Sequence, residues 1–213
     1  MLPRFIIIAH FVLLPLMFLK AQTNVFYPAD SLLSSRSVSL IRKSLIFPIA
    51  GWQRLSYKSN GLDCQFSPSC SNYGAHAIAK HGIMLGPVMA ADRIARCNPM
   101  ALEYHAKLGN EFLAEDFRIL DPVKPMERNS EKSPFVAAMM SAMIPGAGRI
   151  YAERSWDGIF GFMMFAMPAS SAYRMRDNTD SAAFSIYAIV TAIFYGGEIY
   201  GAWRTAKYYQ KVE

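Results

Sequence analysis

The segment CQFSPSCSNYGAHAIAKHG, residues 64–82, contains the signals that decide the local fold. Ser69 or Ser71 can cap a helix that starts here, because a serine hydroxyl accepts a hydrogen bond from the backbone of the first helical turn. Gly82 is suited to end that helix. Gly86 and the proline after it then open another helix, since proline at a first helical position lacks only an N–H group that would be unpaired anyway.

Residues 38–57 precede this segment and predict an amphipathic helix. A proline at position 48 is expected to kink it. A basic amphipathic helix with a tryptophan can lie in a membrane interface, but an ordinary core helix has the same pattern, so both interpretations stay open. The residues on its apolar face are Leu40, Ile41, Leu45, Ile46, Ile49, Trp52 and Leu55.

The composition indicates a membrane-associated protein. Of the 213 residues, 53% are hydrophobic, and the mean hydropathy of +0.14 is high for a soluble chain. The net charge of +6 is concentrated between residues 36 and 107, where nine Lys/Arg face three Asp/Glu. Beside so much apolar sequence, this basic stretch favours anionic lipid over nucleic acid. A solvated helix face is the alternative.

The N-terminal 21 residues resemble a signal peptide or an anchor. Arg4 precedes an apolar run of about 15 residues, which is short for a membrane span of ~20. Cleavage after Ala21 is expected, and an uncleaved anchor is the alternative. Composition divides the rest into a linker at 22–36, a helical domain at 37–125, a linker at 126–133, and a C-terminal membrane domain at 134–213.

Two apolar segments in the last part predict a membrane hairpin. Residues 158–173 are uncharged, and residues 182–203 contain one charge, Glu198. A buried helix pair of a soluble protein is the alternative. The PGAG turn before them is expected to place Arg149 and Tyr151 at headgroup level. The predicted fold class is thus all-α, a small helical cysteine-containing domain followed by a transmembrane helical hairpin.

The three cysteines, Cys64, Cys70 and Cys97, allow several kinds of chemistry. A zinc site would need His76 or His81 as the fourth ligand, and the cysteine spacing does not fit a zinc finger or ribbon, so no metal is predicted. A catalytic thiol lacks an oriented base. One disulfide is compatible only with an oxidising compartment. Otherwise the three are small buried hydrophobic residues. No phosphate-binding glycine loop or HExxH motif is present, and neither an enzyme nor a cofactor is predicted.

The stretch from Trp52 to Pro99 resembles the YidD family of membrane protein insertion efficiency factors. Its family pattern contains YQR, CRFxPTCSxYA, HG, RCHP and DPVP. The matching residues, taken as structural motif positions, are Gln53, Arg54, Cys64, Phe66, Pro68, Cys70, Ser71, Tyr73, His81, Gly82, Gly86, Arg93, Arg96, Cys97 and Pro99.

The chain departs from this pattern in four places. Ser56-Tyr57-Lys58 stands where the family has ISP, Ser69 replaces the family threonine, and Asn98 replaces the histidine after the third cysteine. The closing motif appears only as Asp121-Pro122-Val123, after an insertion of about 20 residues at about 100–120. The loss of the histidine weakens any metal or acid–base role.

The resemblance implies a non-enzymatic accessory factor that aids insertion of proteins into the bacterial inner membrane. It implies inner-membrane lipids as partners, with the insertase and translocon as candidate partners and no nucleic acid. An envelope thiol or metal-binding protein and a lipid-perturbing protein are the alternatives. Charge cues around the spans conflict with a cleaved signal peptide, so the side of the cysteine domain stays open. The residues expected to contact lipid headgroups or a partner are Arg42, Lys43, Arg54, Lys80, Arg93 and Arg96.

Overall fold

The computed structural model describes residues 26–57, 64–109, 112–123 and 132–208. The predicted signal peptide lies outside these ranges. Within them the chain forms eight helices and two strands of two residues each, so the predicted all-α class is confirmed.

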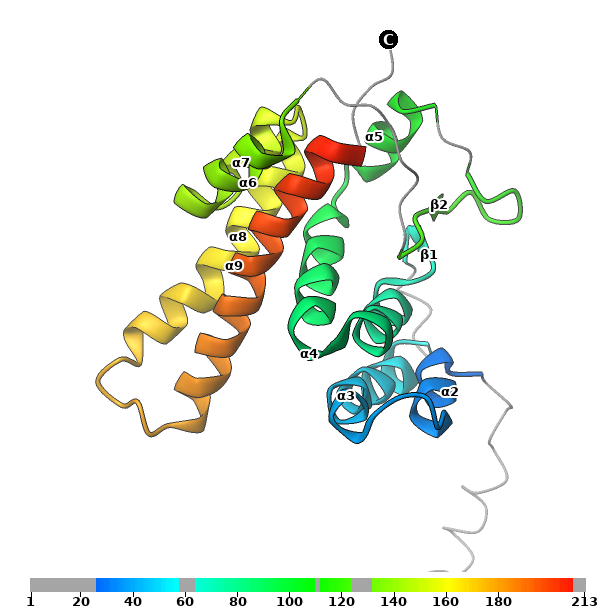
Figure 1. Cartoon of the computed structure of the whole chain (residues 1–213), viewed down its shortest axis with the longest axis vertical. Coiled ribbons are helices and arrows are strands. Elements are labelled where there is room, and N and C mark those ends of the chain that lie inside the picture. The colour runs from blue at the N-terminus through cyan, green and yellow to red at the C-terminus, as the bar shows by residue number, and fades with distance from the viewer. Residues whose placement is uncertain (1–25, 58–63, 110–111, 124–131, 209–213) are drawn as a thin grey trace, which may run out of the picture.

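The helices fall into two groups that pack on either side of α4 (Figure 1). The first group surrounds the cysteines and the second forms the C-terminal part. The bounds are α2 Pro28–Ser34, α3 Leu40–Ser56, β1 Phe66–Ser67, α4 Cys70–Arg96, α5 Ala101–Lys107, β2 Ile119–Leu120, α6 Pro134–Met143, α7 Ala147–Tyr151, α8 Ser155–Arg174 and α9 Ala182–Tyr208.

Helix α2 occupies part of the segment predicted to be an irregular linker. Pro28 stands at its start, where a missing N–H costs nothing. Ala29 is fully buried, and its N–H donates to the Gln53 side chain of α3 at 3.0 Å. This tertiary contact, which local sequence does not show, gives the short helix its place in the core.

Helix α4 is folded back on itself at Gly82, which has a φ of 85° that favours glycine. The two helices predicted on either side of this residue are therefore present as two arms of α4. A Cβ on Gly86 would lie 2.5 Å from Cα of Ile78, so the arms touch through backbone. As a result, the first and last residues of α4 lie at the same end of the fold.

At the end of the insertion, strand β2 lies next to β1 in the cysteine region. Strand β2 pairs in parallel with β1, with Phe66 opposite Ile119 and Ser67 opposite Leu120. This pairing carries Asp121 back to α4. The incomplete closing motif thus occupies a defined place despite the extra residues before it.

Helices α8 and α9 run antiparallel as a packed pair (Figure 1). Among the described residues, only the 27-residue α9 is long and apolar enough to cross a membrane by length and composition. The hairpin prediction is therefore confirmed as a helix pair, with one transmembrane candidate instead of two. Helix α9 also packs against α4 and α6, so the C-terminal part is joined to the cysteine domain by direct contact.

We expect Gly86→Ala to destabilise the protein by roughly 1–3 kcal/mol, because the new methyl group overlaps the Ile78 backbone. Gly51→Ala is the matched control. It lies in the interior of α3 with nothing within 4 Å of its Cβ position, and it should be neutral or stabilising by up to about 1 kcal/mol. Thermal unfolding in mild detergent, followed by circular dichroism, measures both. Equal midpoints for the two variants would show that the arms of α4 are not in tight contact.

Candidate functional site

The three cysteines meet at the end of the fold where α4 begins and finishes. We call Cys64, Cys70 and Cys97 the cysteine corner. Cys70 is the first residue of α4, Cys97 is its C-terminal cap, and Cys64 precedes β1. All three sulfur atoms lie within 4.8 Å of one another, and those of Cys64 and Cys70 are 3.6 Å apart. The fold-back of α4 is what brings Cys97 to the other two.

Hydrogen bonds polarise this corner. The thiols of Cys70 and Cys97 bond to the Cys64 sulfur and lower the pKa of Cys64. The backbone N–H of Cys70 also donates to that sulfur at 3.4 Å. The same contact with Cys64 raises the pKa of Cys70. The three thiols therefore form one hydrogen-bonded set.

The family-motif residues around the corner enclose Arg93. Its guanidinium lies 4.0 Å from the ring centre of Phe66 and 4.8 Å from that of Tyr73. It donates to the Pro68 carbonyl at 2.9 Å and pairs with Asp121. Phe66, Pro68 and Tyr73 thus form the walls of a site for a buried cation from the chain itself.

Arg93 belongs to a larger set of buried charges, which we call the ionic network. Every side chain in it is at most 5% exposed. Four cations face three anions, so its formal charge is +1. The members are Asp92, Arg93, Arg96, Asp121, Arg149, Glu198 and Arg204.

Asp92 is the centre of the network toward the C-terminal part. Its carboxylate lies 3.1 Å from Arg96 Nε, 2.9 Å from Arg149 Nη1 and 3.1 Å from Arg204 Nη1. Arg149 also pairs with Glu198 at 3.1 Å. Because Arg149 is in α7 and Arg204 is in α9, this carboxylate connects the two parts of the molecule.

Asp121 is the second centre. It pairs with Arg93 and Arg96 of α4 and lies 3.2 Å from Arg204. Arg204 also donates to the Tyr73 hydroxyl at 2.9 Å. The closing motif and the end of α9 are therefore held by the same acidic side chain.

Both carboxyl groups are strongly acidic in the folded protein. Burial raises the pKa of Asp92, but Arg96, Arg149 and Arg204 outweigh it and bring the pKa to about 2. Burial likewise raises the pKa of Asp121, but its three arginine partners outweigh this effect and bring the pKa below that of Asp92. Both groups are consequently ionised at neutral pH.

Asn98 makes a second connection to the C-terminal part. Its side-chain amide donates to Asp157 of α8 at 2.6 Å, and Asp157 accepts from Arg154 at 2.9 Å. Asn98, which stands where the family has histidine, is thus one of the residues that contact α8.

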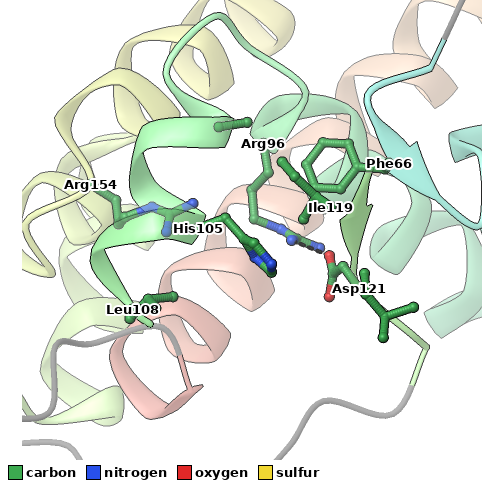
Figure 2. A pocket seen from close by; sticks show the side chains of 9 residues that line it. Phe66, Arg96, His105, Leu108, Ile119, Asp121 and Arg154 are labelled. Atoms are coloured by element: carbon green, nitrogen blue, oxygen red, sulfur yellow. Dashed lines mark hydrogen bonds and ion pairs between the residues drawn. The ribbon is translucent and has the colours of Figure 1, made fainter. Parts of the chain in front are cut away.

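A small cavity lies between these contacts. Figure 2 shows Arg96, His105, Asp121 and Arg154 around it, with Phe66 at one side. Its volume of about 30 Å³ gives room for water and none for an organic substrate.

The other motif residues hold the helices together. Gln53 is fully buried, accepts from Ala29 and donates to Ser71 Oγ at 3.3 Å. Ser69 accepts from the Asn72 N–H at 3.3 Å, as predicted for the cap of α4.

His81 lies immediately before the bend at Gly82. Arg42 of α3 donates to the nearby Ala79 carbonyl at 2.7 Å. Pro99 is exposed beside the corner.

The structure separates the six predicted lipid-contact residues into two sets. Arg93 and Arg96 are buried in the ionic network, so their predicted contact with headgroups is wrong. Arg149, expected at headgroup level, is fully buried for the same reason. Lys80 and Arg54 are exposed, Arg42 and Lys43 are half-buried, and for these four the contact stays a prediction. Arg54 pairs with Asp30 at 2.9 Å on the surface.

Sequence reasoning missed Asp92, Asp157, Glu198 and Arg204 as site residues. Glu198 and Arg204 could have been recognised from the sequence, because ionisable residues within or beside an apolar segment usually face the protein interior. Their partners could not be predicted, since they are distant in the chain. Asp92 and Arg204, for example, are 112 positions apart.

Comparison with known proteins finds relatives of the segment that contains the three cysteines. The family model described as "Putative membrane protein insertion efficiency factor" (YidD) matches residues 41–106. A relative with this description from Oleidesulfovibrio alaskensis is 43% identical over 60 residues, which cover 28% of this chain and 70% of the relative. The chain belongs to the YidD family.

Two further relatives carry the same description. A relative from Anaeromyxobacter sp. is 42% identical over 28% of this chain and 81% of its own length. A relative from Exiguobacterium sp. is 33% identical over a segment that covers 44% of this chain and 96% of the relative. No solved structure matches. The YidD match ends at residue 106, so Arg149, Glu198 and Arg204 lie beyond it.

We expect Asp121→Asn to lower the free energy of unfolding at pH 7 by about 3–5 kcal/mol, because it leaves three buried arginines without this counter-charge. The wild type should also lose stability as pH falls below about 4, the unfolded pKa of aspartate, toward the depressed folded pKa. The variant should show a smaller loss. Urea unfolding in detergent at pH 7 and at lower pH measures both effects.

Asp30→Asn is the control, since its exposed pair with Arg54 should contribute at most about 1 kcal/mol. An Asp121→Asn protein as stable as this control would show that the network does not hold the fold.

Proposed function

We propose that this protein is a membrane-bound accessory factor that assists the insertion of other proteins into the bacterial inner membrane, and that it does so without catalysis. Its membership of the YidD family supports the general role. The observation that carries the proposal is the outward face of α3, which is exposed and uncharged.

The two sides of α3 differ completely in their contacts. Ile46, Ala50 and Gln53 are buried against neighbouring helices. With successive residues ~100° apart, the opposite side forms one continuous face. This face, which we call the α3 apolar face, consists of the exposed residues Leu40, Ile41, Ser44, Phe47, Pro48, Gly51, Trp52 and Leu55.

The α3 apolar face is unusual for a surface in contact with water. Leu40 is 83% exposed, Phe47 71% and Leu55 72%. Contiguous exposed apolar surface marks a contact with a membrane or another protein. A helix with such a face, a tryptophan and flanking basic residues fits the membrane interface. The structure therefore favours the interfacial interpretation of this helix over the core interpretation.

Other apolar surfaces extend the contact. Ile83, Met84 and Leu85 follow the bend of α4 and are exposed, and Arg42 ties this bend to α3. Along the hairpin, Phe162 and Met163 of α8 and Ile186 and Ile189 of α9 are exposed as well. The loop between α8 and α9 and helix α3 lie at the same end of the long axis in Figure 1. One bilayer can therefore contact both.

Basic residues are suitably placed to support this contact. Lys43 and Arg54 lie on α3 beside the apolar face, and Lys80 is exposed near the end of the first arm of α4. Cations in these positions attract anionic headgroups, each by about 1 kcal/mol. We propose headgroup contact for Arg42, Lys43, Arg54 and Lys80, and the membrane insertase or translocon as the protein partner.

If the α3 apolar face lies in the interface, Trp52 should be quenched by lipids brominated on the acyl chain and protected from aqueous iodide. The measurement uses full-length protein in vesicles containing anionic lipid, with Trp156 and Trp203 replaced by Phe. The control carries Trp52→Phe and Phe117→Trp in the same background, since Phe117 is 75% exposed on the insertion and belongs to no helix. Equal iodide quenching at positions 52 and 117 would exclude membrane contact by α3.

The function itself is tested by cell-free synthesis of a membrane protein into vesicles that contain the insertase. Added wild-type protein should raise the protease-protected, inserted fraction about twofold or more. Phe47→Glu with Leu55→Glu should remove most of this gain, because each charge would be forced into an apolar interface at a cost of ~2–3 kcal/mol if it reached the hydrocarbon.

Leu102→Glu with Phe117→Glu is the matched control, as both residues are exposed apolar side chains outside α3. No gain with wild-type protein would refute the insertion role. A gain with wild type that the α3 variant keeps would refute only the role of the α3 apolar face.

A further inference from the structure

We propose that the cysteine corner is a binding site for one thiophilic metal ion, with Cys64, Cys70 and Cys97 as its three protein ligands and Zn²⁺ as the expected ion. This inference does not depend on the proposed role in insertion. It rests on the positions of the three sulfur atoms, on the donors around them and on access from outside.

The sulfur atoms are spaced for a common metal ion. Zn–S bonds of ~2.3 Å in tetrahedral geometry place two sulfurs about 3.8 Å apart. The sulfurs of Cys64 and Cys70 are 3.6 Å apart, and no pair in the corner exceeds 4.8 Å. Movements of about 1 Å or less, within the reach of a cysteine rotamer adjustment, complete the geometry.

The ligands are held by regular structure. Cys70 begins α4 and Cys97 caps it, while Cys64 is followed by the strand that pairs with β2. Gly86 keeps the arms of α4 in contact, and this contact fixes the separation between Cys70 and Cys97. A site whose ligands are fixed before the ion arrives binds it with little loss of conformational entropy.

The donor set selects the kind of ion. Within the described part of the chain, the ligand cluster contains three sulfurs and neither a carboxylate nor an imidazole. Thiolates prefer Zn²⁺, Cu⁺ and similar ions over Mg²⁺ and Ca²⁺. His76 and His81, the sequence candidates for a fourth ligand, are not in this cluster, so none of the described residues is assigned as the fourth ligand.

Neighbouring N–H groups support bound thiolates. The Cys70 backbone donates to the Cys64 sulfur at 3.4 Å. Gln65 donates from its side chain to the Cys97 sulfur at 3.5 Å and to the Asn98 carbonyl at 3.1 Å. Such outer contacts orient metal ligands and stabilise their charge. Gln65 is therefore a positioning residue for Cys97.

The corner is open to solvent on one side. Cys64 and Gln65 line a surface groove together with Leu102, Asp116 and Arg118, so an ion can reach the Cys64 sulfur. Binding replaces three thiol protons by one divalent ion, giving a tris-thiolate complex of charge −1 and three released protons, with no change of oxidation state.

The prediction from sequence excluded a metal because the spacing of the cysteines fits no zinc finger or ribbon. Zinc fingers and ribbons take their paired cysteines from short turns. The bend of α4 brings together residues 27 positions apart, Cys70 and Cys97, and so removes the spacing objection.

The test uses the full-length protein in detergent, reduced and then freed of metal and reductant under argon. Co²⁺ serves as the spectroscopic probe. We expect one Co²⁺ per chain, thiolate-to-cobalt charge-transfer absorption, displacement by Zn²⁺, and proton release on binding. Cys97→Ser and Cys64→Ser should each weaken binding by more than the ~10–100-fold that loss of an outer-shell partner costs. Gln65→Ala should weaken it within that range.

His76→Ala is the matched control and should bind Co²⁺ as the wild type does. Circular dichroism of each variant separates loss of a ligand from loss of the fold. Reduced, folded wild type with three titratable thiols that takes up no Co²⁺ would overturn the proposal, as would binding that survives Cys97→Ser. Binding lost in air and restored by reductant would support it, because a Cys64–Cys70 disulfide removes two ligands.

Discussion

The pairing of Asp92 and Asp121 with buried arginines is the interaction on which the arrangement of the whole chain depends. These two carboxylates contact arginines from α4, α7 and α9, which come from both the cysteine domain and the C-terminal part. Removing so many charges from water is costly, and replacing them by apolar side chains would often be no less stable. Their benefit is geometrical, because an arginine fork accepts only a few orientations of a carboxylate. We infer that the network fixes how α9 is oriented against α4.

The sharp bend in α4 supplies both chemical features of the molecule. It returns the second arm of the helix to the level of Cys70, so that Asp92, Arg93, Arg96 and Cys97 follow one another on the last turns. The aspartate and the arginines face the ionic network, while Cys97 reaches the corner. Asn98, the next residue, contacts Asp157 of α8. A cysteine of the corner and a contact to the hairpin are therefore adjacent residues of the chain.

Local signals in the sequence predicted local structure well. The cap at Ser69, the break at Gly82 and the two apolar segments of the hairpin all depend on nearby residues, and each is present. What could not be predicted depends on contacts between distant segments. The charge of Arg93 suggests an exposed side chain until Asp121 is brought beside it by the β1–β2 pairing. Short helix α2 is likewise held by Gln53, a residue 24 positions from its partner. The proximity of Cys97 to Cys70 likewise depends on the bend of α4 and not on nearby residues.

The network also limits how much of α9 is available to lipid. Glu198 and Arg204 are committed to partners in α7, in α4 and at Asp121, so the uncharged part of the helix is residues 182–197. Sixteen helical residues extend ~24 Å, which is less than the ~30 Å thickness of a typical hydrocarbon core. A hairpin that crosses the membrane would therefore need the bilayer to thin around it. A hairpin that enters the headgroup layer by its loop, without crossing the membrane, needs no such thinning. Because α3 lies at the same end of the molecule as that loop, an α3 among the headgroups agrees with this second arrangement. The apolar face of α3 and the short apolar part of α9 then follow from one position at the membrane surface.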